Sequence, residues 1–168
     1  MNYHSITYPD LNNGVGLRVT LWLSGCNNKC KGCQNPQTWN ANSGKRFNKS
    51  TKEELFSILS KEYISGITFS GGDPLHENNI IELNNLINEI KENFPNKNIW
   101  IYSGNTIDDI FNEDSLRKEI IKKCDIFVDG KFIEELKDLS LPWRGSANQR
   151  VIDVQKTLSQ NKIVLYCN

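Results

Sequence analysis

The chain has 168 residues, and its 20 lysine and arginine residues balance its 20 aspartate and glutamate residues. This length suits one domain with a substantial core, so we expect a single domain over residues 1–168. The dispersed charge argues against a large basic face for nucleic acid, and no stretch approaches the ~18 apolar residues of a membrane span or an apolar leader, so a cytoplasmic protein without a membrane partner is expected.

Apolar, β-rich segments alternate with helical patterns along most of the chain, which is typical of βα units and a mainly parallel sheet. The expected strands are 18–24, 66–70, 98–103, 125–129 and 162–167, with 150–154 as a candidate sixth. A complete (β/α)₈ barrel needs about 250 residues. Five or six mainly parallel strands therefore predict an α/β fold, either an open partial (β/α) barrel or an open twisted sheet, and we expect the partial barrel.

Three helical stretches lie between these strands. Ser50, with Glu53 three residues later, has the pattern of a capping box and predicts a helix that starts just after it. Within 77–94 one helical stripe should pack on the core: Ile80, Leu83, Leu86, Ile87, Ile90 and Phe94. The third stretch, 107–123, has a break near Asn112, and its apolar residues Leu116, Ile120 and Ile121 should face the sheet.

Polar or glycine-rich segments follow four of the expected strands. A cysteine cluster follows the first, Gly71–Asp73 the second, Gly104 the third and Gly130 the fourth. Because chemistry in such folds collects at the carboxyl ends of the strands, these segments should share one edge of the sheet. The sequence therefore predicts one functional site there.

Three cysteines lie within eight positions, as C-x₃-C-x₂-C: Cys26, Cys30 and Cys33. In a reducing cytosol such a cluster more often binds a metal or does redox chemistry than forms disulfides. A [4Fe–4S] cluster held only by protein takes four cysteines, so three leave one iron open to a small-molecule ligand. A structural zinc site with His4, Cys124 or Cys167 as fourth ligand is one alternative, and a redox dithiol is another.

The spacing resembles the hallmark of the radical S-adenosylmethionine enzymes. That hallmark usually has an aromatic residue before the third cysteine, whereas this chain has Gly32. The resulting C-x-G-C motif resembles the corresponding motif in the activating proteins of anaerobic ribonucleoside-triphosphate reductase. Four segments are similar to those proteins and extend the resemblance over nearly the whole chain: 9–39, 69–75, 127–132 and 144–154. Asn28 departs from the histidine of many relatives, at a position that is not a cluster ligand.

The resemblance implies an oxidoreductase with a [4Fe–4S] cluster on Cys26, Cys30 and Cys33, whose open iron binds S-adenosyl-L-methionine. One electron from the cluster would cleave this cofactor into methionine and a 5′-deoxyadenosyl radical. The radical would take a hydrogen atom from a glycine of the anaerobic ribonucleoside-triphosphate reductase and leave a glycyl radical. The resemblance also implies a low-potential electron donor such as flavodoxin or ferredoxin.

The resemblance places three groups of residues near the cofactor. They are Gly32, Cys33 and Gln34 in the cysteine loop, Gly71, Gly72 and Asp73 after the second strand, and Asp129 and Lys131 after the fourth. The two glycines let the backbone approach closely, and Asp73 is expected to support the cationic amino end of the cofactor. Asp129 and Lys131 are candidates for its carboxylate or ribose, with a solvated turn as the alternative.

Other features have less specific interpretations. The segment 12–18 is expected to form a rim or partner-contact element, and 144–150 (RGSANQR) to recognise a partner or close the site. Cys124 and Cys167 are expected to be buried or incidental thiols. The alternatives to the leading function are activation of a pyruvate formate-lyase-like enzyme, modification of a small molecule, and a zinc-stabilised binding module without catalysis.

Overall fold

The computed structural model of the chain describes residues 1–113 and 115–167. The strands are β1 (Asn2–Asp10), β2 (Arg18–Leu23), β3 (Lys45–Arg46), β4 (Gly66–Gly71), β5 (Asn98–Ser103), β6 (Ile126–Asp129), β7 (Arg150–Asp153) and β8 (Leu165–Cys167). The α-helices are α1 (Lys49–Leu59), α2 (Ile80–Asn93), α3 (Ile107–Phe111), α4 (Leu116–Lys122) and α5 (Val154–Gln160). Two 3₁₀ helices are η1 (Pro36–Thr38) and η2 (Glu134–Leu136). Over these two ranges, no helix has the length and apolar character needed to cross a membrane.

The strands form one open, mixed sheet in the order β3-β1-β2-β4-β5-β6-β7-β8. The central strands β2, β4, β5 and β6 run parallel, and the outer pairings are antiparallel. The α/β class is confirmed, but the expected five or six mainly parallel strands are wrong, because the described residues form eight strands and only the three pairings among the central four are parallel. Since β3 and β8 lie at opposite edges, the barrel is not closed, and an open partial barrel stays a prediction.

The two strands that the sequence analysis missed lie on the β1 side of the sheet. In β1 exposed side chains at Ser5, Thr7 and Pro9 alternate with partly buried ones, so β1 has no continuous apolar run. Such alternation is typical of an antiparallel strand with one solvated face. β3 has only two residues, both exposed. The six expected strands all form, although the last is shorter than 162–167. β7 pairs antiparallel with β6, and β8 pairs antiparallel with β7.

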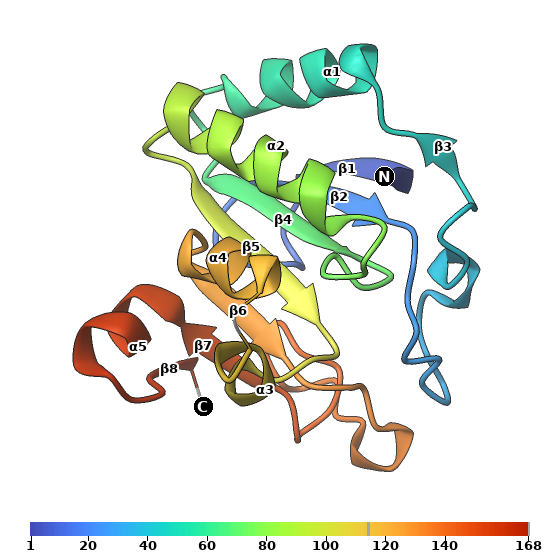
Figure 1. The fold of residues 1–168 in the computed structure, drawn as a ribbon, viewed down its shortest axis with the longest axis vertical. Coiled ribbons are helices and arrows are strands. Elements are labelled where there is room, and N and C mark those ends of the chain that lie inside the picture. Colours follow the sequence, from blue (N-terminus) through green and yellow to red (C-terminus); the bar gives the residue numbers. More distant parts are fainter. Residues whose placement is uncertain (114, 168) are drawn as a thin grey trace.

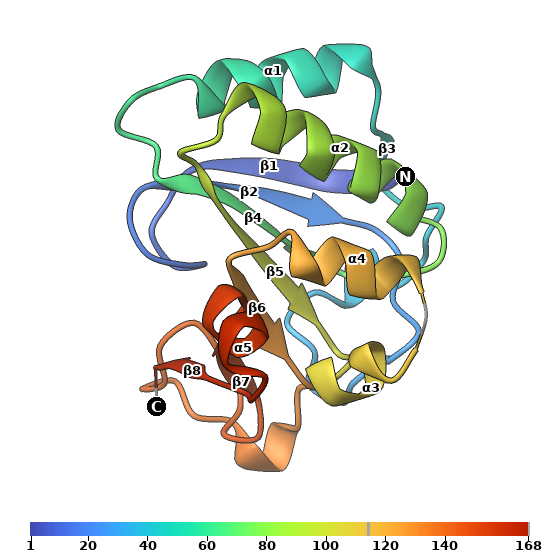
Figure 2. The ribbon, with the colours of Figure 1, turned by 60° about the vertical axis from the view of Figure 1, so that its left-hand side comes forward.

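The two faces of the central sheet differ in chemistry because successive side chains of a strand point to opposite faces. One face is covered by α1, α2, α4 and α5, as Figures 1 and 2 show. Its core contains buried strand residues Val19, Leu21, Leu23, Ile67, Phe69, Ile99, Ile101 and Phe127. The alternate positions include the buried polar residues Arg18, Thr20 and Thr68. The face without helices is therefore partly polar, and it leads to the site.

All three predicted helical stretches form. The α2 stripe buries Leu83, Leu86, Ile87 and Ile90, with Ile80 and Phe94 packed against the same core. The third stretch is broken into α3 and α4 around Asn112, as expected. The start of α1 is wrong, because Asn48 rather than Ser50 is the N-cap: its side chain accepts a hydrogen bond from the Thr51 backbone N–H.

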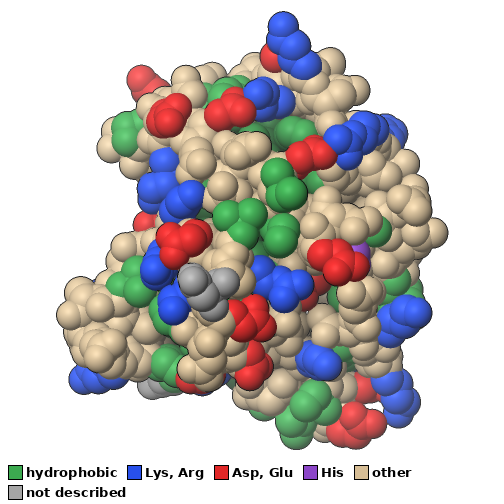
Figure 3. Space-filling model, viewed as in Figure 1, with side chains coloured by type: hydrophobic (Ala, Val, Ile, Leu, Met, Phe, Trp, Pro, Cys, Tyr) green, Lys and Arg blue, Asp and Glu red, His purple; other side chains and the backbone are tan. Residues whose placement is uncertain are grey.

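The surface shown in Figure 3 carries acidic and basic side chains side by side, without a large area of one sign. This mixture agrees with the balanced composition of the chain. On this face, specificity for a partner would have to come from local shape and particular residues, because no broad electrostatic field is present.

Arg18, at the start of β2, organises the polar face of the sheet. Its side chain is fully buried and donates hydrogen bonds to Thr68 Oγ1 (2.8 Å), the Ile67 carbonyl (2.7 Å) and the Val15 carbonyl (3.1 Å). Its guanidinium carbon lies 5.2 Å from the centroid of the Trp100 ring. Burial lowers the pKa of Arg18 to about 10, which leaves the group charged at neutral pH. Arg18 thus ties the loop between β1 and β2 to β4 and β5.

We predict that Arg18→Met lowers the free energy of unfolding by about 3 kcal/mol, because methionine leaves several buried acceptors without a donor. The control is Lys45→Met, which removes an exposed positive charge from β3 and should change stability by less than about 0.5 kcal/mol. Urea unfolding followed by circular dichroism measures both values. Equal midpoints for the two variants would contradict the role given to Arg18.

Candidate functional site

The loops at the carboxyl ends of β2, β4, β5 and β6 surround a cavity of about 450 Å³. Seven of the expected site residues line it: Cys26, Cys30, Cys33, Gln34, Gly71, Gly72 and Lys131. Three others, Gly32, Asp73 and Asp129, lie outside the lining. The structure therefore brings most of the expected residues to one edge of the sheet, where the parallel strands end (Figure 1).

The cysteine loop leaves β2 and is held by backbone contacts. The backbone N–H groups of Gly25 and Cys26 donate to the carbonyls of Thr38 (2.7 Å) and Trp39 (3.0 Å), at the end of η1. Cys26, Cys30 and Cys33 are partly buried free thiols, and desolvation by burial raises the pKa of Cys26. Three unpaired thiols on one cavity wall are a donor set that suits a [4Fe–4S] cluster, in which each thiolate binds a different iron.

The candidate fourth zinc ligands occupy other environments. His4 Nε2 lies 2.9 Å from Ser43 Oγ, and the buried Cys124 thiol donates to the Ile120 carbonyl, one helical turn back. Cys167 is in β8, at the opposite edge of the sheet from β3. Within 1–113 and 115–167, no three His, Cys, Asp or Glu side chains gather closely enough for a single metal ion. Cys124 is the buried thiol that the sequence analysis expected.

Gly71, the last residue of β4, and Gly72, the next residue, are required by the close approach of the cysteine loop. Gly72 and Asp73 donate backbone hydrogen bonds to the carbonyls of Leu23 (2.8 Å) and Gly25 (2.7 Å). A Cβ on Gly71 would lie 2.6 Å from the Leu23 carbonyl oxygen, and one on Gly72 would lie 2.5 Å from that of Gly25. Any larger residue would push the cysteine loop away from β4.

Asp73 is buried beneath the cavity instead of lining it. Its carboxylate accepts hydrogen bonds from the Leu75 backbone N–H (2.9 Å), Ser103 Oγ (2.8 Å), the Gly104 backbone N–H (3.2 Å), Asn105 Nδ2 (3.2 Å) and Asn28 Nδ2 (3.2 Å). Burial raises the pKa of Asp73, against the opposing effect of these hydrogen bonds. Asp73, which was expected to contact the cofactor, thus holds three loops together through its hydrogen bonds. We call this group of contacts the Asp73 junction.

Asn28 connects this junction to the cysteines. Besides its bond to Asp73, the Asn28 amide donates to Cys26 Sγ at 3.7 Å. Gly104 makes room for it, since a Cβ there would lie 2.2 Å from Asn28 Nδ2. This bridging role was not predicted from the sequence, because the two loops that Asn28 joins are far apart in the chain.

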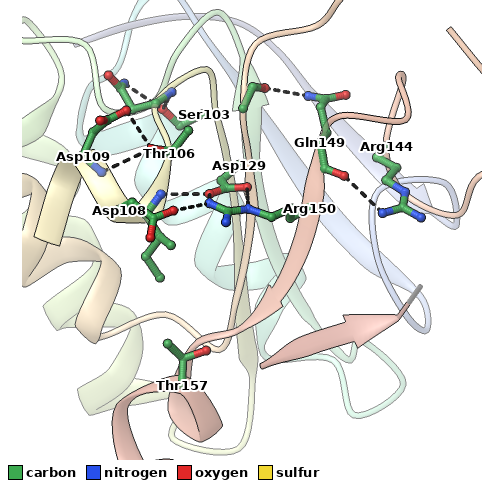
Figure 4. Close-up of polar contacts among 12 residues, drawn as sticks. Ser103, Thr106, Asp108, Asp109, Asp129, Arg144, Gln149, Arg150 and Thr157 are labelled. Carbon is green, nitrogen blue, oxygen red and sulfur yellow. Dashed lines mark hydrogen bonds and ion pairs between the residues drawn. The ribbon is translucent and has the colours of Figure 1, made fainter. Parts of the chain in front are cut away.

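Asp129, at the end of β6, is also occupied by protein partners. It forms an ion pair with Arg150, whose Nη2 also pairs with Asp108 at 2.7 Å, and it accepts a hydrogen bond from the Ile107 backbone N–H at 2.8 Å. Figure 4 shows the Arg150 guanidinium between the two carboxylates. This arrangement raises the pKa of Arg150 and joins β6, β7 and the start of α3. Lys131, in contrast, is exposed and lines the cavity.

The segment after β6 closes one side of the cavity. Three of its lining residues belong to the segment 144–150, which was expected to recognise a partner or close the site: Arg144, Gly145 and Gln149. Four others were not singled out from the sequence: Phe132, Leu139, Leu141 and Trp143. Asn12 and Asn13, from the expected rim segment 12–18, also line the cavity, and Trp22, Ser70 and Tyr102 do so from the strands. Strand alternation points to the last three, because they share a face with Thr20, Thr68 and Trp100.

The chain is similar to several known proteins. A family model described as "4Fe-4S single cluster domain" matches residues 12–152. A protein of Enterobacteria phage T4, named "Anaerobic ribonucleoside-triphosphate reductase-activating protein", is 45% identical over 151 residues, which are 90% of this chain and 93% of the relative. Proteins with the same name from Escherichia coli K12 and Vibrio cholerae are each 40% identical, covering 90% and 89% of this chain and 97% and 96% of the relatives.

We predict that Asp73→Asn lowers the free energy of unfolding by about 3 kcal/mol, because one acceptor oxygen becomes a donor that faces other donors. The cysteine loop should also hold a reconstituted cluster less well, so iron per chain should fall. Glu77→Gln, at an exposed position in the same loop, is the matched control and should change neither quantity. Chemical unfolding and iron analysis measure the two effects, and wild-type values for Asp73→Asn would refute the junction.

Proposed function

Because this chain belongs to the 4Fe-4S single cluster domain family and to the activating proteins of anaerobic ribonucleoside-triphosphate reductase, we propose that it is a radical S-adenosylmethionine enzyme. Its reaction would generate a glycyl radical on the large subunit of that reductase. The cofactors in this proposal are a [4Fe–4S] cluster and S-adenosyl-L-methionine. The observation that carries it is the set of three unpaired cysteine thiols that line one cavity at the carboxyl edge of the sheet.

The chemistry needs one electron and no hydrolytic residues. With both cofactors bound, one electron from the cluster would break a carbon–sulfur bond of S-adenosylmethionine, giving methionine and a 5′-deoxyadenosyl radical that takes a hydrogen atom from the glycine and becomes 5′-deoxyadenosine. The electron would come from a low-potential donor such as flavodoxin or ferredoxin. Both partners are in keeping with a cytoplasmic location, which is part of the proposal.

The protein residues would bind the cofactors and position them. Cys26, Cys30 and Cys33 would each ligate one iron as thiolates and leave the fourth iron open to the cofactor. Asn28 would donate a hydrogen bond to the Cys26 sulfur, an interaction that tunes the potential of such clusters. Because Asn28 is also bonded to Asp73, its amide has a fixed orientation.

The other candidate residues fall into two groups. Gly32, Gln34, Gly71, Gly72 and Lys131 remain proposed neighbours of S-adenosylmethionine. For Asp73 and Asp129 we propose positioning roles, because their carboxylates are buried and bonded to protein groups. They would act on the cofactor only through the loops that they hold.

The alternative substrates make different predictions. A pyruvate formate-lyase-like partner or a small molecule would use the same cluster and the same cleavage, so cluster chemistry alone does not separate them. The names of relatives at 39–45% identity favour the reductase. A zinc-binding module would need a fourth ligand beside the three cysteines, and the candidates His4, Cys124 and Cys167 lie in other environments.

We predict that anaerobically reconstituted protein contains about four iron atoms per chain. With S-adenosylmethionine, a strong reductant and the reductase, it should then produce a glycyl-radical signal in electron paramagnetic resonance. Cys30→Ser should lose the cluster and the signal, because a ligand is removed. Cys167→Ser, a free thiol in β8, is the control and should keep both.

Two other outcomes are informative. Methionine formation without a radical on the reductase would support cofactor cleavage and refute the proposed partner. Colourless protein that retains one zinc ion would refute the radical chemistry as a whole.

A further inference from the structure

Two cationic side chains, Lys131 and Arg144, line the cavity, whereas no acidic side chain of the described chain does so. Lys131 is exposed and Arg144 is partly buried. The described lining therefore offers two cationic side chains and no carboxylate that could pair with them. A ligand with a negatively charged group would supply the missing partner.

Arg144 is the less satisfied of these two groups. Its Nη1 donates to the Gln149 carbonyl at 3.1 Å, while its buried Nε has no hydrogen-bond partner in the structure. Within 1–113 and 115–167 it forms no ion pair with a carboxylate. A buried donor without an acceptor is unfavourable and is rare in native proteins, so it points to an acceptor that the polypeptide does not itself provide.

Arg150, at the other end of the segment 144–150, is an arginine with a structural role and serves for comparison. It is paired with Asp108 and Asp129, on the far side of Gln149 from Arg144 (Figure 4). The two arginines are six residues apart and have opposite environments. Arg150 holds elements of the fold together through two ion pairs, whereas Arg144 forms no ion pair among the described residues and acts on a carboxylate only through a small contribution to the lowered pKa of Asp138.

The position of Arg144 beside the cysteine loop is well defined. The Gln149 side chain accepts hydrogen bonds from the backbone N–H groups of Gly145 (2.9 Å) and Ser146 (3.2 Å) and donates to the Gly130 carbonyl (2.9 Å). A Cβ on Gly145 would lie 3.5 Å from Gln34 Nε2, next to Cys33. Arg144 thus lies on a braced turn that adjoins the proposed cluster ligands.

We propose that Arg144 binds the methionyl carboxylate of S-adenosylmethionine. This inference rests on the proposed function and deepens it. The planar guanidinium presents two donors that match a carboxylate, and the adenosyl part of the cofactor has no negative charge to offer. A carboxylate has two oxygens, so one can bind iron while the other accepts a hydrogen bond from Arg144. Arg144 is therefore a binding and positioning residue for the methionyl end of the cofactor.

The test compares two ligands on cluster-loaded protein under anaerobic conditions, by equilibrium dialysis. One is S-adenosylmethionine, and the other is decarboxylated S-adenosylmethionine, which lacks only the carboxylate. Arg144→Gln should raise the Kd for the first about 10- to 100-fold and leave the Kd for the second within about twofold. Arg144→Lys, which keeps the charge but loses the fork, should fall between wild type and Arg144→Gln.

The control is Lys137→Gln, which removes the same charge from an exposed position of the same segment that does not line the cavity, and it should bind both ligands like wild type. Iron content and thermal midpoint show whether each variant is folded and loaded. If Arg144→Gln weakens the binding of both ligands equally, its role is structural and the proposal is overturned. The proposal is also overturned if Lys131→Gln weakens the binding of S-adenosylmethionine and Arg144→Gln does not.

The remaining outcomes separate this proposal from the proposed function. If wild-type protein holds no cluster or binds no S-adenosylmethionine, the proposed function itself fails. If wild type binds the cofactor and Arg144→Gln binds it equally well, only the assignment of Arg144 fails. Unchanged cofactor binding together with weaker binding of the reductase would assign Arg144 to a carboxylate of the partner chain and overturn the proposal.

Discussion

The buried carboxylate of Asp73 is the interaction on which the geometry of the candidate site depends. It accepts hydrogen bonds from its own loop and from the loops that follow β2 and β5, so three segments distant in the chain meet at one group. An ionised carboxylate is costly to bury unless several donors surround it. The loops that carry these donors are therefore held close to Asp73. Backbone contacts with Gly71 and Gly72 then fix the position of the cysteine loop.

The parts of the fold predicted from the sequence are those with strong local signals. Central strands such as 66–70 and 98–103 are apolar runs, and the α2 stripe has the helical period, so each follows from its own residues. In β1 exposed and partly buried side chains alternate, and β3 has only two residues. β1 is a strand because it pairs with β2, and β3 is one because it pairs with β1, which no local pattern reveals. The same applies to the site: spacing identified the three cysteines, whereas the roles of Asn28 and Arg144 depend on contacts between distant segments.

Gly32 is part of the motif that resembles the reductase activators, and the local backbone also requires glycine at this position. Its φ of +69° favours glycine, and a Cβ there would lie 2.6 Å from Glu134 Oε1 of η2. The neighbouring Lys31 forms ion pairs with Glu134 and Glu135; these pairs are exposed and each is weak. Glycine at this position therefore allows the segment after β6 to pack against the cysteine loop, so the motif that resembles reductase activators has a structural basis in this chain.

The cavity is built from two halves of different construction. One half is made by the ends of β2, β4 and β5, which share backbone pairing and the Asp73 junction. The other is the long segment between β6 and β7, attached through Gln149 and through Arg150 with its two carboxylates. In a small closed barrel, side chains would fill the interior. Because this sheet is open, one side of the cavity is formed by a loop instead of a strand, and that loop contributes the exposed Leu139 to the lining.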